Sequence, residues 1–159
     1  DVHVSDAMIL GGPIENVLQS GIGARTGGLQ TSTLAVGLSM AAAKFLSAEA
    51  ENRQDLLEPS AQLMDEVKIL RDTLLAACSG EVSCDASEIR GQANRLVLRS
   101  TQAALMAAKG AGFVDGHPAG RWCQQALFFL VWSCPQPISH AHLCELTNIP
   151  LSLDLGPTS

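Results

Sequence analysis

The chain has 159 residues, of which 47% are hydrophobic and 16% are charged, a length and composition that suit one globular domain and exclude a disordered chain. The formal net charge is −6, and no basic stripe is present that could neutralise phosphates, so we expect no nucleic-acid partner. The longest apolar run extends from Ala126 to Trp132. It is far shorter than the ~20 residues of a membrane-spanning helix, so we expect no membrane span.

The cysteines are an odd number without paired spacing, which does not indicate a disulfide framework. We interpret them as reduced thiols of a cytoplasmic protein. A loop disulfide between Cys78 and Cys84 is the alternative interpretation. The complete set is Cys78, Cys84, Cys123, Cys134 and Cys144.

The first ten residues alternate the β-branched Val2 and Val4 with polar residues, a pattern typical of a short strand or an extended tail. Gly11-Gly12-Pro13 ends this pattern. A lone strand is not stable by itself. We therefore predict that residues 1–13 are an extended tail, the remnant of a preceding β-domain.

Apolar residues at helical spacing predict two long helices in the first half of the chain. One runs from about residue 28 to residue 50. The side chains of its apolar face are Leu34, Leu38, Ala41 and Phe45. The other begins near Pro59 and ends at Ser79-Gly80. Its apolar stripe consists of Leu63, Val67, Leu70, Leu74 and Ala77.

A third long helix begins at Asp85-Ala86-Ser87-Glu88, which is similar to a capping box, and ends at Gly110 and Gly112. Its apolar face is rich in small residues, so a neighbouring helix can approach closely. The residues of that face are Ile89, Ala93, Leu96, Ser100, Ala103 and Ala107.

A fourth helix opens at His117-Pro118. Its segment 126–132 is apolar all round, so we expect burial on most sides. Its main face contains Trp122, Ala126 and Phe129, widened by Leu127 and Leu130.

A short fifth helix is predicted from about Ile138 to Leu146. The whole pattern predicts an all-α fold: an up-down four-helix bundle over residues 14–147 with a short extra C-terminal helix. We expect an extended N-terminal tail, and a C-terminal tail over residues 148–159.

His140-Ala141-His142-Leu143-Cys144 contains three potential zinc ligands. On a helix, residues 140 and 144 share a face while 142 points away, and no second ligand cluster has zinc spacing. We therefore expect a partly exposed helix and no metal site. Ser133-Cys134 could hold a nucleophile if His117 or His140 lay beside it as a base. The alternative is a helix-ending turn with a buried thiol.

Gly110-Ala111-Gly112 could approach a ligand backbone closely, or could simply end a helix. It follows a helix instead of a strand, so it is no dinucleotide fingerprint. Gly27-Gly28 has the same two interpretations, and it lacks the Lys-Ser/Thr ending of a P-loop.

The stretch Gly110-Ala111-Gly112-Phe113, followed by the helix start at Pro118, resembles the C-terminal domain of acyl-CoA dehydrogenases. In that family a turn similar to Gly-Gly-Asn-Gly-Phe precedes a proline-containing helix start, and the helix ends in Tyr-Glu-Gly-Thr. Counting forward without gaps puts Trp132 at the family's Tyr and Ser133 at its Glu. The order and lengths of the other predicted elements are similar over nearly the whole chain.

The resemblance implies a flavin-dependent oxidoreductase that removes two hydrogens from an acyl-CoA thioester. In the family a glutamate takes the α-proton and FAD takes the β-hydrogen as hydride. The resemblance also implies a homo-oligomer that assembles through the helical bundle. It assigns FAD contacts, made to a neighbouring subunit, to Gly110, Gly112 and Phe113.

Three departures from the family pattern limit this implication. Ser133 cannot serve as a carboxylate base, and Leu29 to Lys44 contains no acidic residue that could replace it. Of the stretch that corresponds to the family's FAD-contacting Arg-Thr-Phe-Gly segment, only Arg53 is a cation. The family's N-terminal and middle domains are not in this chain. We therefore expect no dehydrogenase turnover by this chain alone and leave the catalytic residues unassigned. The alternative function is a non-catalytic helical module for oligomerisation or regulation.

Overall fold

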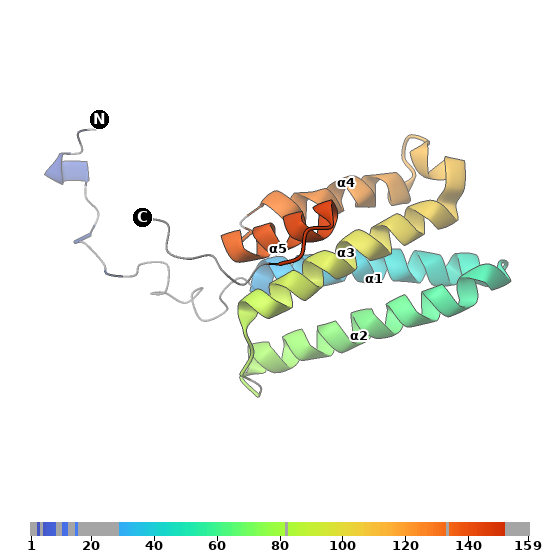
Figure 1. Cartoon of the computed structure of the whole chain (residues 1–159), viewed down its shortest axis with the longest axis horizontal. Coiled ribbons are helices and arrows are strands. Elements are labelled where there is room, and N and C mark those ends of the chain that lie inside the picture. Colours follow the sequence, from blue (N-terminus) through green and yellow to red (C-terminus); the bar gives the residue numbers. More distant parts are fainter. Residues whose placement is uncertain are drawn as a thin grey trace.

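The computed structural model describes residues 3, 5–8, 11, 12, 15, 29–81, 83–132 and 134–151. This part of the chain is helical and contains no strand, which confirms the predicted all-α class. Figure 1 shows how the labelled helices pack together. The helices are α1 (Leu29–Ala50), α2 (Leu57–Ser79), α3 (Ala86–Ala108), α4 (Pro118–Val131) and α5 (Gln136–Thr147). Short 3₁₀ helices are η1 (Asp6–Met8), η4 (Gln54–Leu56) and η5 (Lys109–Phe113).

The described part of the N-terminal tail differs from the extended conformation predicted for it. Asp6–Met8 form the 3₁₀ helix η1, in which the N–H of Met8 donates to the carbonyl of Ser5 at 2.8 Å. A 3₁₀ turn needs only local hydrogen bonds, whereas a strand needs a partner strand. The other residues of the predicted strand, among them Val2 and Val4, lie outside the described residues, as do Gly27 and Gly28.

Local capping sets the boundary between α2 and α3 as the sequence predicts. Gly80 ends α2 in a left-handed conformation with φ 77°. Asp85 precedes α3, and its side chain accepts a hydrogen bond from the N–H of Ser87 at 2.8 Å. In a full capping box the Glu88 carboxylate would accept from the backbone N–H of Asp85. Here it accepts instead from the Gln92 side-chain amide at 3.3 Å.

The end of α3 lies earlier than its glycines predicted. The residue in the left-handed region is Lys109, with φ 52°, whose N–H donates to the Met106 carbonyl. Gly110 and Gly112 fall within η5, which tightens the chain for one more turn before α4. The helix therefore ends at a lysine, and the glycines serve the turn that follows.

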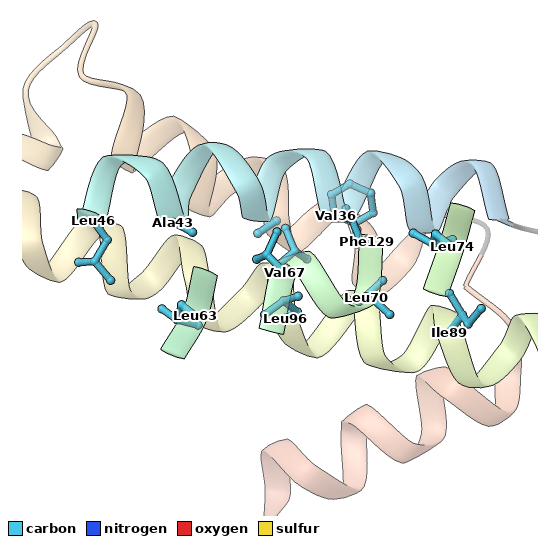
Figure 2. Packing of buried hydrophobic residues seen from close by; sticks show 14 of the residues in the cluster. Val36, Ala43, Leu46, Leu63, Val67, Leu70, Leu74, Ile89, Leu96 and Phe129 are labelled. Atoms are coloured by element: carbon cyan, nitrogen blue, oxygen red, sulfur yellow. The ribbon is translucent and has the colours of Figure 1, made fainter. Parts of the chain in front are cut away.

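The core lies around α1, which packs against α2, α3 and α4. Side chains from four helices meet there, and Figure 2 shows Val36 of α1, Val67 of α2, Leu96 of α3 and Phe129 of α4 in one layer. The stripes predicted for α2 and α3 are buried, apart from half-buried Ala77 and Ala103.

The face predicted for α1 is wrong in part. Leu34 is 66% exposed, and Leu38 is only half-buried. The residues that α1 buries are mostly small: Leu29, Ser32, Ala35, Val36, Ser39, Ala42, Ala43, Leu46 and Ala50. Small side chains let the α1 backbone approach α3 closely, so the helix turns its Ala- and Ser-rich face inward and leaves larger residues at the margin.

The predicted burial of segment 126–132 on most sides is also wrong. Ala126 and Phe129 are buried as expected. Leu127, Phe128 and Val131 are exposed, because α4 packs against α1 and α3 through one side only. The other side of this all-apolar segment forms part of the surface.

Candidate functional site

The outer face of α4 consists of Leu127, Phe128, Val131 and Trp132, which recur at positions i, i+1, i+4 and i+5 and so project from the same side of the helix. Their exposed fractions are 57, 47, 79 and 58%. The rings of Phe128 and Trp132 stack with centroids 5.2 Å apart and planes at 18°. Four large apolar side chains thus form one continuous surface with a fixed aromatic pair.

A groove of about 510 Å³ runs beside this surface, between α1 and α4. We call it the α1–α4 groove. Its apolar lining comes from Leu34 and Leu38 of α1 and from Phe128 and Phe129 of α4. Its polar lining is Arg121, Gln124 and Gln125. Within the described residues, no hydrogen bond or ion pair joins Arg121 to the rest of the chain.

A second hollow, of about 370 Å³, lies on the other side of α4, beside η5. Two of the residues that the family resemblance assigns to FAD, Gly112 and Phe113, line it, whereas Gly110 does not. Phe113 is 80% exposed. Gly112 is buried, because α4 comes so close that a Cβ at Gly120 would collide with the Gly112 carbonyl oxygen. The glycine turn therefore serves helix packing and leaves Phe113 at the rim of a hollow.

The structure does not bring together the predicted nucleophile pair. His117 lies at the start of α4, where its Nδ1 accepts from the N–H of Ala119 at 3.2 Å, and its ring meets Phe45 edge-on at 5.7 Å. Cys134 follows the opposite end of the helix. His140 is 3.6 Å from the thiol of Cys144. Ser133 lies outside the described residues, so its predicted position at the family's glutamate stays a prediction.

Cys134 is instead part of a polar cluster that closes the C-terminal end of α4. Buried Arg90 donates to the carbonyls of Phe129 at 3.3 Å and Trp132 at 2.9 Å. Asn94 donates to the Phe129 carbonyl at 3.1 Å and contacts the Cys134 thiol at 3.8 Å. Burial lowers the pKa of Arg90. This cation meets the negative end of the helix dipole and the carbonyls that α4 leaves unpaired.

The helical pattern did not predict this cluster, although the sequence contains a signal for it. Arg90 and Asn94 are four residues apart, beside Ile89 and Ala93 on the stripe of α3 that was predicted to be apolar. A charged residue at such a position is almost never fully buried without partners. The partners are backbone carbonyls from another helix, which leave no trace in the sequence.

Arg53, the cation that aligns with the family's FAD-contacting segment, is occupied within this chain. Its Nη1 donates to the Ala107 carbonyl at 2.8 Å, near the end of α3, and its Nη2 donates to Asp55 at 3.3 Å. The guanidinium, which comes from the α1–α2 connection, therefore caps the C-terminal end of α3. This assignment weakens any role of Arg53 toward a cofactor.

The His-rich segment lies on α5, which is partly exposed as predicted. His140 and Cys144 share a face, as expected, but His142 is buried too, with its Nδ1 3.4 Å from a Glu145 carboxylate oxygen. No group of three His, Cys, Asp or Glu side chains in the described part of the chain could hold a metal ion.

All five cysteines are described and none forms a disulfide. Burial raises the pKa of the Cys123 thiol, which opposes thiolate chemistry there.

Comparison with protein-family models, with curated proteins and with solved structures finds no match to this chain. The resemblance to acyl-CoA dehydrogenases therefore rests on the residues quoted above. Among the described residues, no helix is long and apolar enough to cross a membrane.

Proposed function

We propose that this chain is a non-catalytic self-association module that binds a second copy of itself through the outer face of α4. The observation that carries the proposal is the exposure of Leu127, Phe128, Val131 and Trp132 beside the α1–α4 groove. With Leu34 these side chains expose on the order of 600 Å² of apolar surface, against ~800 Å² that each partner buries in a standard interface. This area is at the upper end of the ~300–600 Å² of the largest apolar patch on a typical monomer, and such patches are often functional.

The charge distribution favours a second copy as the partner. Each chain has a net charge of −6, so two copies repel each other in general. However, α4 contains no acidic residue, and Arg121 is its only charge. The outer face of α4 is therefore a place where two copies can meet without bringing carboxylates together.

We infer that α1 to α4 form an up-down four-helix bundle. Its support is the packing of α1 against the other three helices and the shortness of the connections. Short connections favour antiparallel neighbours. In Figure 1 the colours along successive long helices advance in opposite directions. Such a bundle would hold α4 rigidly at one edge, as a binding surface requires.

A pair of matched aspartate substitutions tests the self-association. Val131 of α4 and Ile69 of α2 are both β-branched, helical and exposed, at 79 and 68%. We expect Val131→Asp to weaken association at least ~10-fold, equivalent to ~1.4 kcal/mol, because it places a desolvated carboxylate in the interface. Ile69→Asp should leave association unchanged. Sedimentation velocity over a concentration series measures both.

Two results would contradict the proposal. One is a wild-type chain that stays monomeric up to high micromolar concentration. The other is equal weakening by both substitutions, which would show a general effect of added negative charge. Circular dichroism of both variants checks that the helices are retained.

A second candidate function follows from the hollow beside η5. We propose, as the alternative, that the chain is the C-terminal domain of an acyl-CoA dehydrogenase-like flavoprotein, with the hollow contacting FAD bound mainly by another subunit. The specific support is the exposed ring of Phe113 beside Gly112, at the place where the resemblance assigns FAD. The ring could stack on an adenine, and Arg121, which also lines the hollow, could pair with a phosphate.

FAD, when bound, would supply hydride acceptance from an acyl-CoA. The residues of this chain would contribute contacts only, since no described carboxylate occupies the family's base position. Titration of FAD into the protein, followed by quenching of flavin fluorescence, tests this candidate. Binding that Phe113→Ala weakens and Met106→Ala, an equally exposed control on α3, leaves unchanged would support it. Absence of FAD binding would count against it. The cytoplasmic location inferred from the cysteines stays a prediction.

A further inference from the structure

We propose that the two copies pair their α4 helices antiparallel about a twofold axis near Leu127 and Phe128, so that the ridge of each lies in the α1–α4 groove of the other. This inference rests on the proposed self-association and adds its geometry. Three observations carry it: the shape of the surface, the position of its only charge, and the exposed indole at the opposite end.

The surface combines a ridge and a groove side by side. Leu127 and Val131, one helical turn apart, form the ridge on the outer face of α4. The adjacent groove of about 510 Å³ has Leu34 and Leu38 along its far wall. A twofold interface uses the same patch on both subunits, so the patch must be complementary to itself. A ridge next to a groove meets this condition, because rotation places each ridge over the other copy's groove.

The charge distinguishes the two possible directions of pairing. Arg121 is the only charged residue on α4, and it has no partner within the described part of its own chain. Parallel pairing would bring the two Arg121 side chains together. Antiparallel pairing instead separates the two Arg121 side chains and places each near the C-terminal end of the partner's α4.

An aromatic ring is exposed at that C-terminal end. Trp132 is 58% exposed, and its ring is held in place by stacking on Phe128. The face of an indole attracts a guanidinium within about 6 Å. In the antiparallel arrangement each Arg121 can therefore reach the Trp132 of the second copy. Two such contacts would form in each dimer, each between the Arg121 of one copy and the Trp132 of the other.

Neutralising Arg121 should change the strength of association in opposite senses for antiparallel and parallel pairing of the α4 helices. In an antiparallel pair, Arg121→Gln removes two attractive contacts, so we expect association to weaken about threefold or more. In a parallel pair the same substitution removes a repulsion, and association would strengthen. The matched control is Arg71→Gln, which neutralises an exposed arginine on α2 and should leave association unchanged. Sedimentation equilibrium measures all three proteins.

Cross-linking tests the register independently. An axis between residues 127 and 128 places Gln124 opposite the second copy's Val131. In a background with Cys78, Cys123 and Cys134 changed to Ser, a mixture of Gln124→Cys and Val131→Cys chains should form a disulfide on mild copper-catalysed oxidation by dioxygen. Each variant alone should cross-link poorly. Both positions are exposed, so the substitutions should preserve the fold.

The outcomes separate this inference from the proposed function. A monomeric wild-type chain would overturn both. Suppose that Val131→Asp disrupts the dimer, but Arg121→Gln strengthens it, or that residue 124 cross-links to 124 and residue 131 to 131. The self-association would then stand, and the antiparallel geometry would be overturned. A dimer weakened by Arg121→Gln and cross-linked only in the mixture supports both.

Discussion

The outer surfaces of α2 and α4 differ, although both helices pack against α1. The exposed residues of α2 include charged side chains, some in ion pairs such as Lys68 with Asp65, and large apolar ones at separate positions, such as Ile69 and Leu75. The outward residues of α4 include Leu127, Phe128 and Val131. Core burial accounts for the inward residues of both helices equally. The proposed self-association would explain why the apolar residues on the outside of α4 form one continuous surface.

The largest expected contrast between the inside and the outside of α4 is in the loss of unfolding free energy when each of two neighbouring phenylalanines is changed to alanine. Phe129 is 6% exposed and lies in the core (Figure 2), so Phe129→Ala should cost ~3–5 kcal/mol of unfolding free energy. Phe128→Ala should cost about 1 kcal/mol or less in the monomer but should weaken association. Urea denaturation at low protein concentration measures the two stabilities. Similar losses for both variants would show that the outer face belongs to the fold.

A smaller effect is expected where α4 meets η5. The Cβ of Gly120→Ala would collide with the backbone carbonyl of Gly112, so the helix start must shift at a cost of ~1–3 kcal/mol. The control is Gly110→Ala, whose added Cβ would meet no atom within 4 Å. We expect the control to be nearly neutral in thermal unfolding. If Gly120→Ala is neutral as well, α4 is not held by this contact, and the rigid edge assumed for the interface is lost.

The smallest effect is expected on the charged side of the molecule. A hydrogen bond from Arg99 holds the pKa of Glu66 below its ordinary value of 4.5. The pair is partly exposed, so Glu66→Gln should cost ~1 kcal/mol or less at neutral pH. Because the folded pKa is depressed, this stabilisation is present above the unfolded-state pKa and disappears as pH falls through the folded-state value.

The comparison of wild type and Glu66→Gln by urea denaturation between neutral pH and pH 3 checks this sign. The difference should shrink toward acid. A matched control is Asp65→Asn, which removes an exposed 3.6 Å contact with Lys68 and should have a still smaller effect. A loss of several kcal/mol for Glu66→Gln would mean that charges on α2 stabilise the fold as strongly as its apolar core.

Much of the fold was predictable because helix boundaries depend on neighbouring residues. Asp85 and Gly80 act through their own backbone within two or three residues, so their roles follow from sequence order. The stripe of α2 was predictable because large apolar residues alternate there with charged ones, and that of α3 because apolar and small residues recur at helical spacing. On α1 the same logic failed. Its inward face consists largely of Ala and Ser, whose small contribution to hydrophobicity hides their close packing.

The candidate site was predictable only in its parts. Gly112 and Phe113 were singled out, and they line one hollow, but the structure gives a different reason for each glycine: a Cβ at Gly112 would meet the Leu105 side chain of α3, and a Cβ at Gly120 would meet the Gly112 carbonyl. Cys134 was paired with the wrong partners. Its neighbours Arg90 and Asn94 come from α3, about forty residues away. Contacts between helices depend on which face each helix turns toward its neighbour. The spacing of residues within one helix does not determine this orientation.

The sequence by itself determined the all-helical class, the C-terminal end of α2 and the start of α3, because capping and helical periodicity act over a few residues. The apolar run from Ala126 to Trp132 was equally plain in the sequence, but its meaning was not. Only the tertiary structure decided that Phe129 lies in the core and that Phe128 lies on the surface. The physical reason is that α4 turns one side toward α1 and α3, so residues of equal hydrophobicity end in opposite environments.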